Sequence, residues 1–186
     1  FLQPEKFIGP VYQPEEQEAL EAAYGWQMKR DGKYLRRVVA SPQPRKILDS
    51  EAIELLLKEG HVVICSGGGG VPVTEDGAGS EAVIDKDLST ALLAQEIRAD
   101  ILVITTGVEQ VCIHFGKPNQ QALDTVDVAT MTRYMQEGHF PPGSMLPKIV
   151  ASLAFLARGG KRVIITTPEC LPAALRGETG THIVHS

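Results

Sequence analysis

From Ile47 onward, the chain alternates between segments with helical periodicity and short runs of β-branched apolar residues. Apolar residues three or four positions apart indicate an amphipathic helix, whereas a short apolar run bounded by turn residues is typical of a buried strand. Strands that alternate with helices fold into a parallel or mixed sheet covered by helices. The alternation therefore predicts an α/β fold, in which ligands bind at the carboxyl ends of the strands.

Caps and breakers give this pattern its boundaries. A helix is expected to begin at the cap residue Ser50 and to end at Gly60. Because ligands gather where strands end, functional residues are expected directly after Ser66, Thr105 and Thr166. The other predicted helices are 85–98, 127–137, 144–158 and 168–175, and the predicted strands are 61–66, 101–105, 111–115, 162–166 and 181–184.

The first 44 residues have a different character, because they are rich in proline, aromatic and charged residues. They offer one short helix over 15–23 and two short strands, 26–28 and 35–39, that can pair around the turn Asp31-Gly32. This region is predicted to be a small excursion without a core of its own.

Composition limits the classes of partner. The 186 residues carry a formal net charge of −5, which provides no basic surface for nucleic acid. No apolar run approaches the roughly 18–20 residues of a membrane helix. Three widely spaced cysteines build neither a disulfide framework nor a metal site, and the histidines show no metal-binding spacing. We therefore expect a cytoplasmic protein with small-molecule partners and no protein-held metal.

Four consecutive glycines, Gly67, Gly68, Gly69 and Gly70, follow the predicted strand 61–66. Glycine lets the backbone approach a ligand closely and can turn several N–H groups toward an anion. No Gly-Lys-Ser or Gly-Lys-Thr follows, so the segment is not a Walker A loop. A phosphate-binding loop and a flexible surface loop both remain open readings.

The tripeptide Asp85-Lys86-Asp87 opens a predicted helix. Asp85 suits the cap position, and Asp87 in the first turn is favoured by the helix dipole. The same dipole disfavours Lys86, unless its ammonium group neutralises a bound anion. Phosphoryl transfer requires mainly charge neutralisation and alignment, so lysine beside aspartate suits that chemistry.

A second helix start repeats the pattern, in Gly143-Ser144-Met145-Leu146-Pro147-Lys148. Ser144 suits the cap, and Pro147 is tolerated in the first turn because its missing N–H would lack a helical partner there. Lys148 again lies where the dipole favours an anion. Two lysines at two helix starts predict a paired phosphate site, although lysines at helix starts are also common on ordinary surfaces.

Taken together, these segments resemble the carbamate kinases of the amino-acid-kinase family. The resemblance extends over essentially the whole chain and keeps one order. Its segments are 4–12, 36–42, 66–72, 82–88, 99–102, 137–140, 143–145, 147–148 and 177–181. So many ordered matches are far more specific than any single glycine run.

The resemblance implies a three-layer αβα sandwich that is incomplete at the N-terminus. Residues 1–44 would form a protruding subdomain, residues 45–99 the remainder of the acceptor (carbamoyl phosphate) lobe, and residues 100–186 the nucleotide-binding lobe. The implied reaction is the reversible conversion of ATP and carbamate to ADP and carbamoyl phosphate, a step of arginine metabolism. The implied cofactors are ATP or ADP with Mg²⁺, and the implied assembly is a homodimer.

By position, the resemblance also assigns roles to single residues. It implies the catalytic residues Lys6, Lys86, Asp87 and Lys148. In this group Lys6 would reach the transferred phosphate. Lys86 and Lys148 would neutralise the polyphosphate, and Asp87 would organise those lysines. The implied substrate or phosphate contacts are Gly67, Gly68, Gly69, Gly70 and Asp85. The implied nucleotide contacts are Thr105, Thr106, Gly107, Gly143, Ser144, Met145 and Lys148.

Two departures keep other functions open. Gly107 and Leu146 stand where the resemblance leads us to expect an aspartate and a glycine. They allow a family enzyme with a different acceptor, or a nucleotide-binding relative without turnover. The start Phe1-Leu2-Gln3 and the missing Gly-Gly-Asn loop predict a C-terminal part of a longer protein, inactive by itself.

Overall fold

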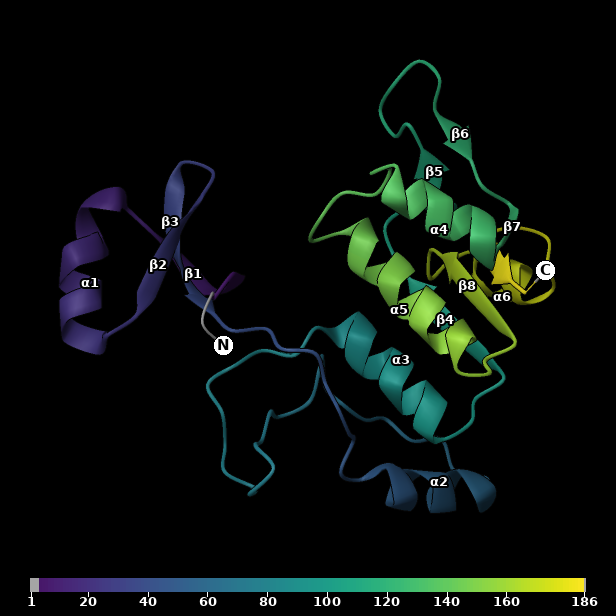
Figure 1. Cartoon of the computed structure of the whole chain (residues 1–186), viewed down its shortest axis with the longest axis horizontal. Helices are drawn as coiled ribbons and strands as arrows, with labels where there is room; N and C mark the ends of the chain where they lie inside the picture. Colours follow the sequence, from purple (N-terminus) through teal and green to yellow (C-terminus); the bar gives the residue numbers. More distant parts are fainter. Residues whose placement is uncertain (1–3, 186) are drawn as a thin grey trace. The chain divides into compact units, whose positions relative to one another are not determined.

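The computed structural model describes residues 4–185, so Phe1, Leu2, Gln3 and Ser186 lie outside the described residues. The chain divides into two compact units (Figure 1). Unit 1 comprises residues 1–44 and 66–86, and unit 2 comprises residues 45–65 and 87–186. The chain therefore passes from one unit to the other three times, the last time between Lys86 and Asp87. The functional division predicted at residues 45 and 100 stays a prediction.

Unit 1 is built on an antiparallel sheet with the strand order β1-β3-β2. Strands β2 (Gln27–Asp31) and β3 (Tyr34–Val39) are joined by the two residues Gly32 and Lys33, which confirms the predicted hairpin. Strand β1 (Lys6–Tyr12) was not predicted, because Gly9-Pro10 interrupts its pattern. The register with β3 shifts between Ile8 and Tyr12, and such an irregularity admits a proline at a sheet edge.

The predicted helix of unit 1 is present as α1 (Gln17–Tyr24), preceded by the short 3-10 helix η1 (Pro14–Glu16). The buried apolar side chains of this unit are few, and they come mainly from β2 and β3. They are Met28, Leu35, Val38, Val39, Ala40 and Ile84. The small core explains why the composition of this region did not predict an independent domain.

Unit 2 contains a mixed sheet with the strand order β4-β8-β9-β7, which confirms the predicted α/β class. Strands β4 (Ile101–Thr105) and β8 (Arg162–Thr166) run parallel, with Thr105 opposite Thr166. Strand β9 (Thr181–Val184) is antiparallel to β8 and parallel to β7 (Thr125–Asp127). The carboxyl ends of β4 and β8 consequently lie at the same edge of the sheet.

Helices cover this sheet and close its core (Figure 1). They are α3 (Lys86–Glu96), α4 (Val128–Gln136), α5 (Met145–Ala157) and α6 (Leu171–Leu175), whereas α2 (Ser50–Lys58) lies beyond α3. A core of almost completely buried side chains joins α5 to the strands, among them Ile149, Phe155, Val163 and Ile183. The large core of unit 2 gives the helix starts of α3 and α5 a firm support.

The predicted strand 61–66 is wrong. These residues belong to no strand, and the side chains of Val62 and Ile64 are 93% and 98% exposed. A strand is stable when a neighbour satisfies its backbone N–H and C=O groups, and no strand among the described residues pairs with this segment. The positive φ of Ser66, 66°, also ends the extended conformation. The sequence pattern led us to expect Ser66 at the end of a strand, but no strand ends there.

Other differences concern boundaries. Asp49 occupies the cap position of α2, and the predicted cap Ser50 is already helical. The expected strand 111–115 is reduced to β5 (Cys112–Ile113), which pairs with the unpredicted β6 (Gln121–Ala122) in a short hairpin. The helix expected from residue 168 begins only at Leu171. Very short strands were missed because two or three residues carry no detectable period.

Candidate functional site

In unit 1, the structure brings Lys6 and Asp85 together although 79 positions separate them. Lys6 Nζ donates a hydrogen bond to Asp85 Oδ2 over 2.9 Å. The lysine side chain is 39% exposed and the aspartate side chain 14%, so the pair lies at a surface rather than in a core. Both residues were predicted site residues, in different roles.

The sheet register explains this meeting. Lys6 stands opposite Val39, the last residue of β3. The next residue, Ala40, forms a parallel bridge with Ala82, and its carbonyl oxygen accepts a hydrogen bond from the N–H of Val83 at 3.0 Å. The segment that ends in Asp85 is thereby aligned beside the start of β1.

The glycine loop, residues 67–70, is hydrogen-bonded to Ser66 and packs against the segment that ends in Asp85. Its backbone N–H groups at Gly69 and Gly70 both donate to the carbonyl oxygen of Ser66, at 2.9 and 2.5 Å. A Cβ atom on Gly69 would lie 2.3 Å from the carbonyl oxygen of Ile84, the residue before Asp85. Glycine is therefore required at position 69 for packing, and two of the N–H groups expected to face an anion are bonded within the loop.

In unit 2, Lys148 and Asp87 form a second pair. Lys148 Nζ donates to Asp87 Oδ2 over 3.0 Å, and the two side chains are only 9% and 8% exposed. Lys148 lies in the first turn of α5, where the helix dipole disfavours a cation. The carboxylate of Asp87, at the start of α3, compensates that charge. The start of α3 and the start of α5 are thus joined by this hydrogen bond.

The predicted nucleotide contacts lie at two places in unit 2. Thr105 is the last residue of β4, and Thr106 and Gly107 follow it; the N–H of Thr106 donates to the carbonyl oxygen of Thr166 at 2.8 Å. Gly143, Ser144 and Met145 lead into α5; Gly143 has a φ of +79°, and Ser144 holds the cap position without a side-chain bond.

Thr166 is a further candidate that the sequence did not single out. Its hydroxyl group is completely buried and has no hydrogen-bond partner among residues 4–185. It ends β8 in register with Thr105, at the edge where α/β sheets bind ligands. That strand-end position was the available sequence signal.

The predicted catalytic residues thus fall into two sets. Lys6 and Asp85 meet in unit 1, while Asp87 and Lys148 meet in unit 2. Lys86 is exposed and stands between the two aspartates at the first position of α3. Their assembly into one three-lysine site stays a prediction.

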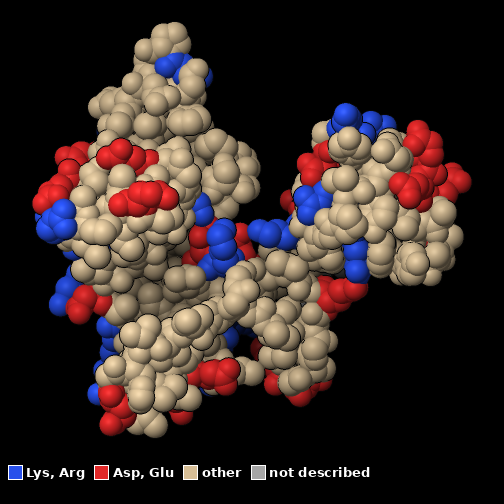
Figure 2. All heavy atoms as spheres, turned by 180° about the vertical axis from the view of Figure 1, so that it is seen from behind, with Lys and Arg blue, Asp and Glu red and all other residues tan. Residues whose placement is uncertain are grey.

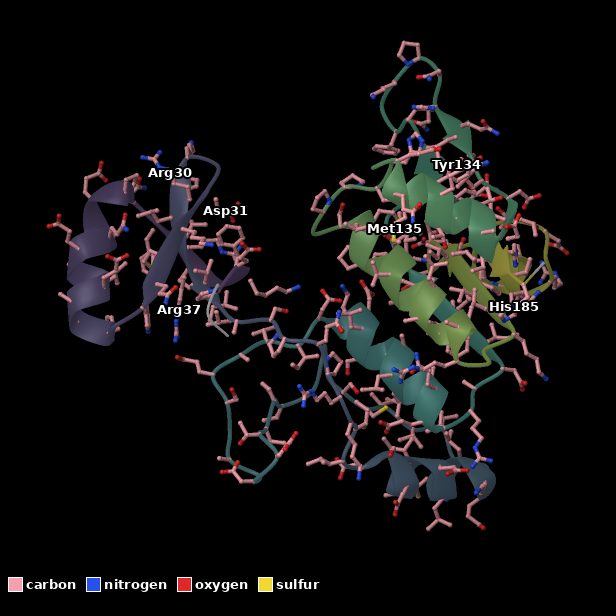
Figure 3. All side chains as sticks on the ribbon, viewed as in Figure 1. Arg30, Asp31, Arg37, Tyr134, Met135 and His185 are labelled. Carbon is pink, nitrogen blue, oxygen red and sulfur yellow. The ribbon has the colours of Figure 1, made fainter. Side chains whose placement is uncertain are left out.

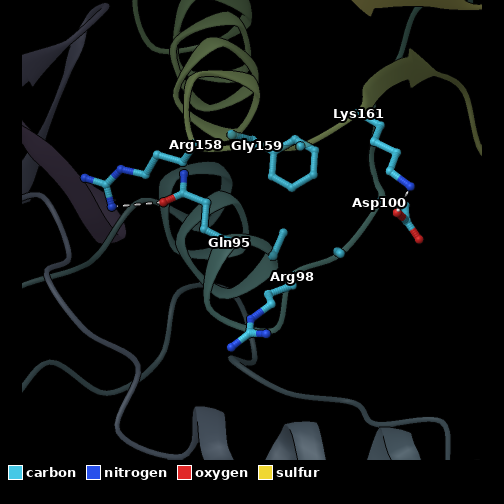
Figure 4. Close-up of a pocket in the computed structure, with 10 residues that line it drawn as sticks. Gln95, Arg98, Asp100, Arg158, Gly159 and Lys161 are labelled. Atoms are coloured by element: carbon cyan, nitrogen blue, oxygen red, sulfur yellow. Dashed lines mark hydrogen bonds and ion pairs between the residues drawn. The ribbon is translucent and has the colours of Figure 1, made fainter.

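A pocket of about 350 Å³ lies elsewhere in unit 2, at the C-terminal ends of α3 and α5 (Figure 4). Arg158 donates to Gln95 Oε1 at 3.1 Å, and Lys161 pairs with Asp100 at 2.7 Å, which holds the pKa of Lys161 above its ordinary value. Helix C-termini carry partial negative charge, which these cations offset and which disfavours a polyphosphate. None of the predicted site residues lines this pocket.

The surface carries both signs of charge. On the face shown in Figure 2, basic side chains are interspersed with acidic ones, and acidic side chains gather over α1 of unit 1. No helix among residues 4–185 has both the length and the apolar character needed to cross a membrane. The predicted absence of nucleic-acid partners stays a prediction.

Comparison with known families decides the class of protein. The model of the amino acid kinase family matches residues 17–167, which is most of the chain. The chain belongs to the amino acid kinase family. The chain carries the Lys–Asp pairs of both units within or beside the matched region.

Within this family, the chain is similar to carbamate kinases. The chain is 66% identical over 99% of its length to the carbamate kinase-like protein YahI of Escherichia coli (strain K12), and 64% identical over 98% to the carbamate kinase of the same strain. A solved carbamate kinase from Giardia lamblia bound to AMP-PNP superposes with a TM-score of 0.90 at 36% identity. That match covers 100% of this chain and 60% of the Giardia chain.

These relationships confirm the predicted resemblance and the amino acid kinase fold. The chain spans about 60% of the length of the relatives it matches.

Proposed function

We propose that the complete protein is a carbamate kinase-like phosphotransferase that converts ADP and carbamoyl phosphate to ATP and carbamate, and the reverse. The observation that carries this proposal is the pair of lysines, Lys6 and Lys148, each held by an aspartate that flanks Lys86. The identity to carbamate kinases over nearly the whole chain supports the acceptor.

In the proposed reaction, a terminal oxygen of ADP attacks phosphorus, and the bond from phosphorus to the carbamoyl oxygen breaks. Negative charge spreads over the transferred phosphoryl oxygens, so positive side chains accelerate the step by neutralising that charge. Lys6, Lys86 and Lys148 are the proposed cations. Asp87 fixes Lys148 in an orientation that the helix dipole alone would oppose.

The nucleotide is proposed to bind unit 2 at the carboxyl ends of β4 and β8. Thr105 ends β4 there and is followed by Thr106 and Gly107, and Thr166, with its buried hydroxyl group, ends β8. Gly143, Ser144 and Met145, at the start of α5, are the other proposed contacts. Sheet edges of this kind bind ligands in many α/β proteins.

Mg²⁺ is proposed to enter with the nucleotide. Among residues 4–185, no group of three or more His, Cys, Asp or Glu side chains is arranged to hold a metal ion. Magnesium is commonly held by substrate phosphates and one or two carboxylates, so a dedicated protein site is not required. The ion would supply charge neutralisation on the polyphosphate.

Cytoplasmic location and a homodimeric assembly complete the proposal. The location is supported by three free cysteines, Cys65, Cys112 and Cys170, which suit a reducing compartment. The assembly rests on the family resemblance.

The direct test uses the full-length gene product with ADP, Mg²⁺ and carbamoyl phosphate, and measures ATP by coupled luminescence. We expect ATP formation that depends on all three components. Lys148→Ala is expected to reduce kcat/KM by about 10³-fold, the scale of a lost transition-state cation. Nucleotide binding without any ATP formation would show that the protein is a non-catalytic relative.

A second candidate is a family enzyme with another acyl phosphate as donor. It is favoured by the similarity to a protein described only as carbamate kinase-like, at 66% identity. The same assay with acetyl phosphate in place of carbamoyl phosphate distinguishes the two candidate functions. A higher kcat/KM with carbamoyl phosphate favours the carbamate kinase, and a higher kcat/KM with acetyl phosphate favours the second candidate.

A further inference from the structure

We propose that Asp85 is the positioning residue for Lys6, rather than a contact to the phosphate itself. This inference rests on the proposed function, and it replaces the substrate-binding role that the sequence resemblance gave to Asp85. A carboxylate repels a phosphate, but it can hold an ammonium group in place for one. The 2.9 Å bond from Lys6 Nζ to Asp85 Oδ2 provides that arrangement.

The pair leaves capacity for a ligand. An ammonium group has three N–H donors, and one of them is directed at Asp85. The Lys6 side chain is 39% exposed, whereas Asp85 is 14% exposed. The lysine can therefore reach a phosphate oxygen while the less exposed aspartate fixes the position of its nitrogen.

The backbone around Asp85 is itself held in place. Ala82 and Val83 are fastened to the end of β3 through Ala40, and Gly69 packs against the carbonyl group of Ile84. Glu81 of the same segment forms an ion pair with Arg37 of β3, labelled in Figure 3. Asp85 thus projects from a segment anchored on both sides, as a positioning residue requires.

A positioning role for Asp85 predicts that its removal lowers kcat without raising KM. Removing the charge of Asp85 leaves more net positive charge near the phosphate, so ground-state binding is not weakened. The unheld lysine, however, stabilises the transition state less well. For Asp85→Asn we expect kcat to fall about 10-fold, the scale of a small misplacement, with KM for carbamoyl phosphate unchanged or lower.

A double-mutant cycle tests the route of the effect. Lys6→Ala is expected to lower kcat about 100-fold. If Asp85 acts through Lys6, then Asp85→Asn adds nothing in the Lys6→Ala background. Glu5→Gln is the matched control, because it removes one negative charge from an exposed side chain next to Lys6 in the sequence, and it should leave kcat as in the wild type.

An activity-independent readout separates this inference from the proposed function. Reductive methylation, quantified by peptide mass spectrometry, should label Lys6 about twofold faster in Asp85→Asn, the protection of a modest ion pair, with Lys29 as internal reference. This arm applies even if the wild type transfers no phosphate, a result that would end the proposed function alone. Unchanged labelling, additive losses in the cycle, or a raised KM would each overturn the role of Asp85.

Discussion

Each unit of the molecule holds a Lys–Asp pair between two predicted site residues, and the two pairs have nearly equal lengths but different surroundings. In unit 1, Lys6 and Asp85 are 39% and 14% exposed; in unit 2, Lys148 and Asp87 are 9% and 8% exposed. Solvent screens the first pair, so its strength is modest. The second pair has lost most of its water, so each charge depends on the other. With nearly the same pair distance, Lys6 is therefore held weakly by its aspartate, whereas Lys148 is held firmly.

The largest effect on stability is expected from breaking the buried pair. Asp87→Asn leaves the Lys148 ammonium uncompensated in the interior and should lower the free energy of unfolding by about 3 kcal/mol. Urea denaturation followed by circular dichroism measures this change. Asp100→Asn is the matched control, because it breaks the exposed pair with Lys161 and should have no measurable effect. Equal midpoints for both variants would contradict the contrast between buried and exposed pairs.

The tight core that supports the buried pair can be tested at Gly160. A Cβ atom there would lie 2.2 Å from the Phe155 ring, so Gly160→Ala should cost about 2 kcal/mol through overpacking. Gly79→Ala in unit 1 has open space around it and an ordinary φ, and should be neutral. The two urea midpoints separate the close-packed unit from the open one; a midpoint for Gly160→Ala at the wild-type value would contradict this packing.

A smaller effect is expected in unit 1 at Gly69. Gly69→Ala forces the carbonyl of Ile84 to move and should lower kcat about 10-fold, because Asp85 and Lys6 move with it. Gly68→Ala shares the strain of a positive φ but meets no neighbour within 4 Å. If both variants lost the same activity, backbone strain rather than the position of Asp85 would explain the result.

The smallest effect is expected outside both pairs, at the start of α4. Asp127 accepts hydrogen bonds from the N–H and hydroxyl of Thr130, which lower the pKa of its carboxyl group. A lowered folded-state pKa means that Asp127 stabilises the fold above its ordinary pKa of 3.8 and loses this contribution as pH falls further. Asp127→Ala should therefore lower the melting temperature slightly at pH 7, and the difference from the wild type should shrink as the pH falls below 3.8; a difference that stays constant with pH would argue against the cap.

The elements with a clear apolar pattern and clear boundaries were predictable from the sequence. Helix α5 was placed within one residue at each end, and β4, β8 and β9 were placed at their observed bounds. The prediction was wrong for residues 61–66, because apolar β-branched residues show strand propensity but not whether a neighbour is present to pair with them. Strand β1 was missed because Gly9 and Pro10 disguise it.

The site was predictable in its residue types but not in its pairings. A lysine at the start of α3 and another at the start of α5 were recognisable as unusual, because the dipole disfavours both. That Asp87 holds Lys148 while Asp85 holds Lys6 follows from tertiary contacts across 61 and 79 positions. No local pattern carries that information. The same holds for Gly69, whose contact with Ile84 depends on the fold of its loop.

The contrast between the two lysines can be measured in one experiment. Reductive methylation of the native full-length protein is followed by mass spectrometry at Lys6 and Lys148, with and without carbamoyl phosphate. We predict that Lys6 is labelled readily and is protected by carbamoyl phosphate, while Lys148 is labelled only when the protein unfolds. Similar labelling of both lysines, or a Lys6 rate indifferent to carbamoyl phosphate, would contradict the account.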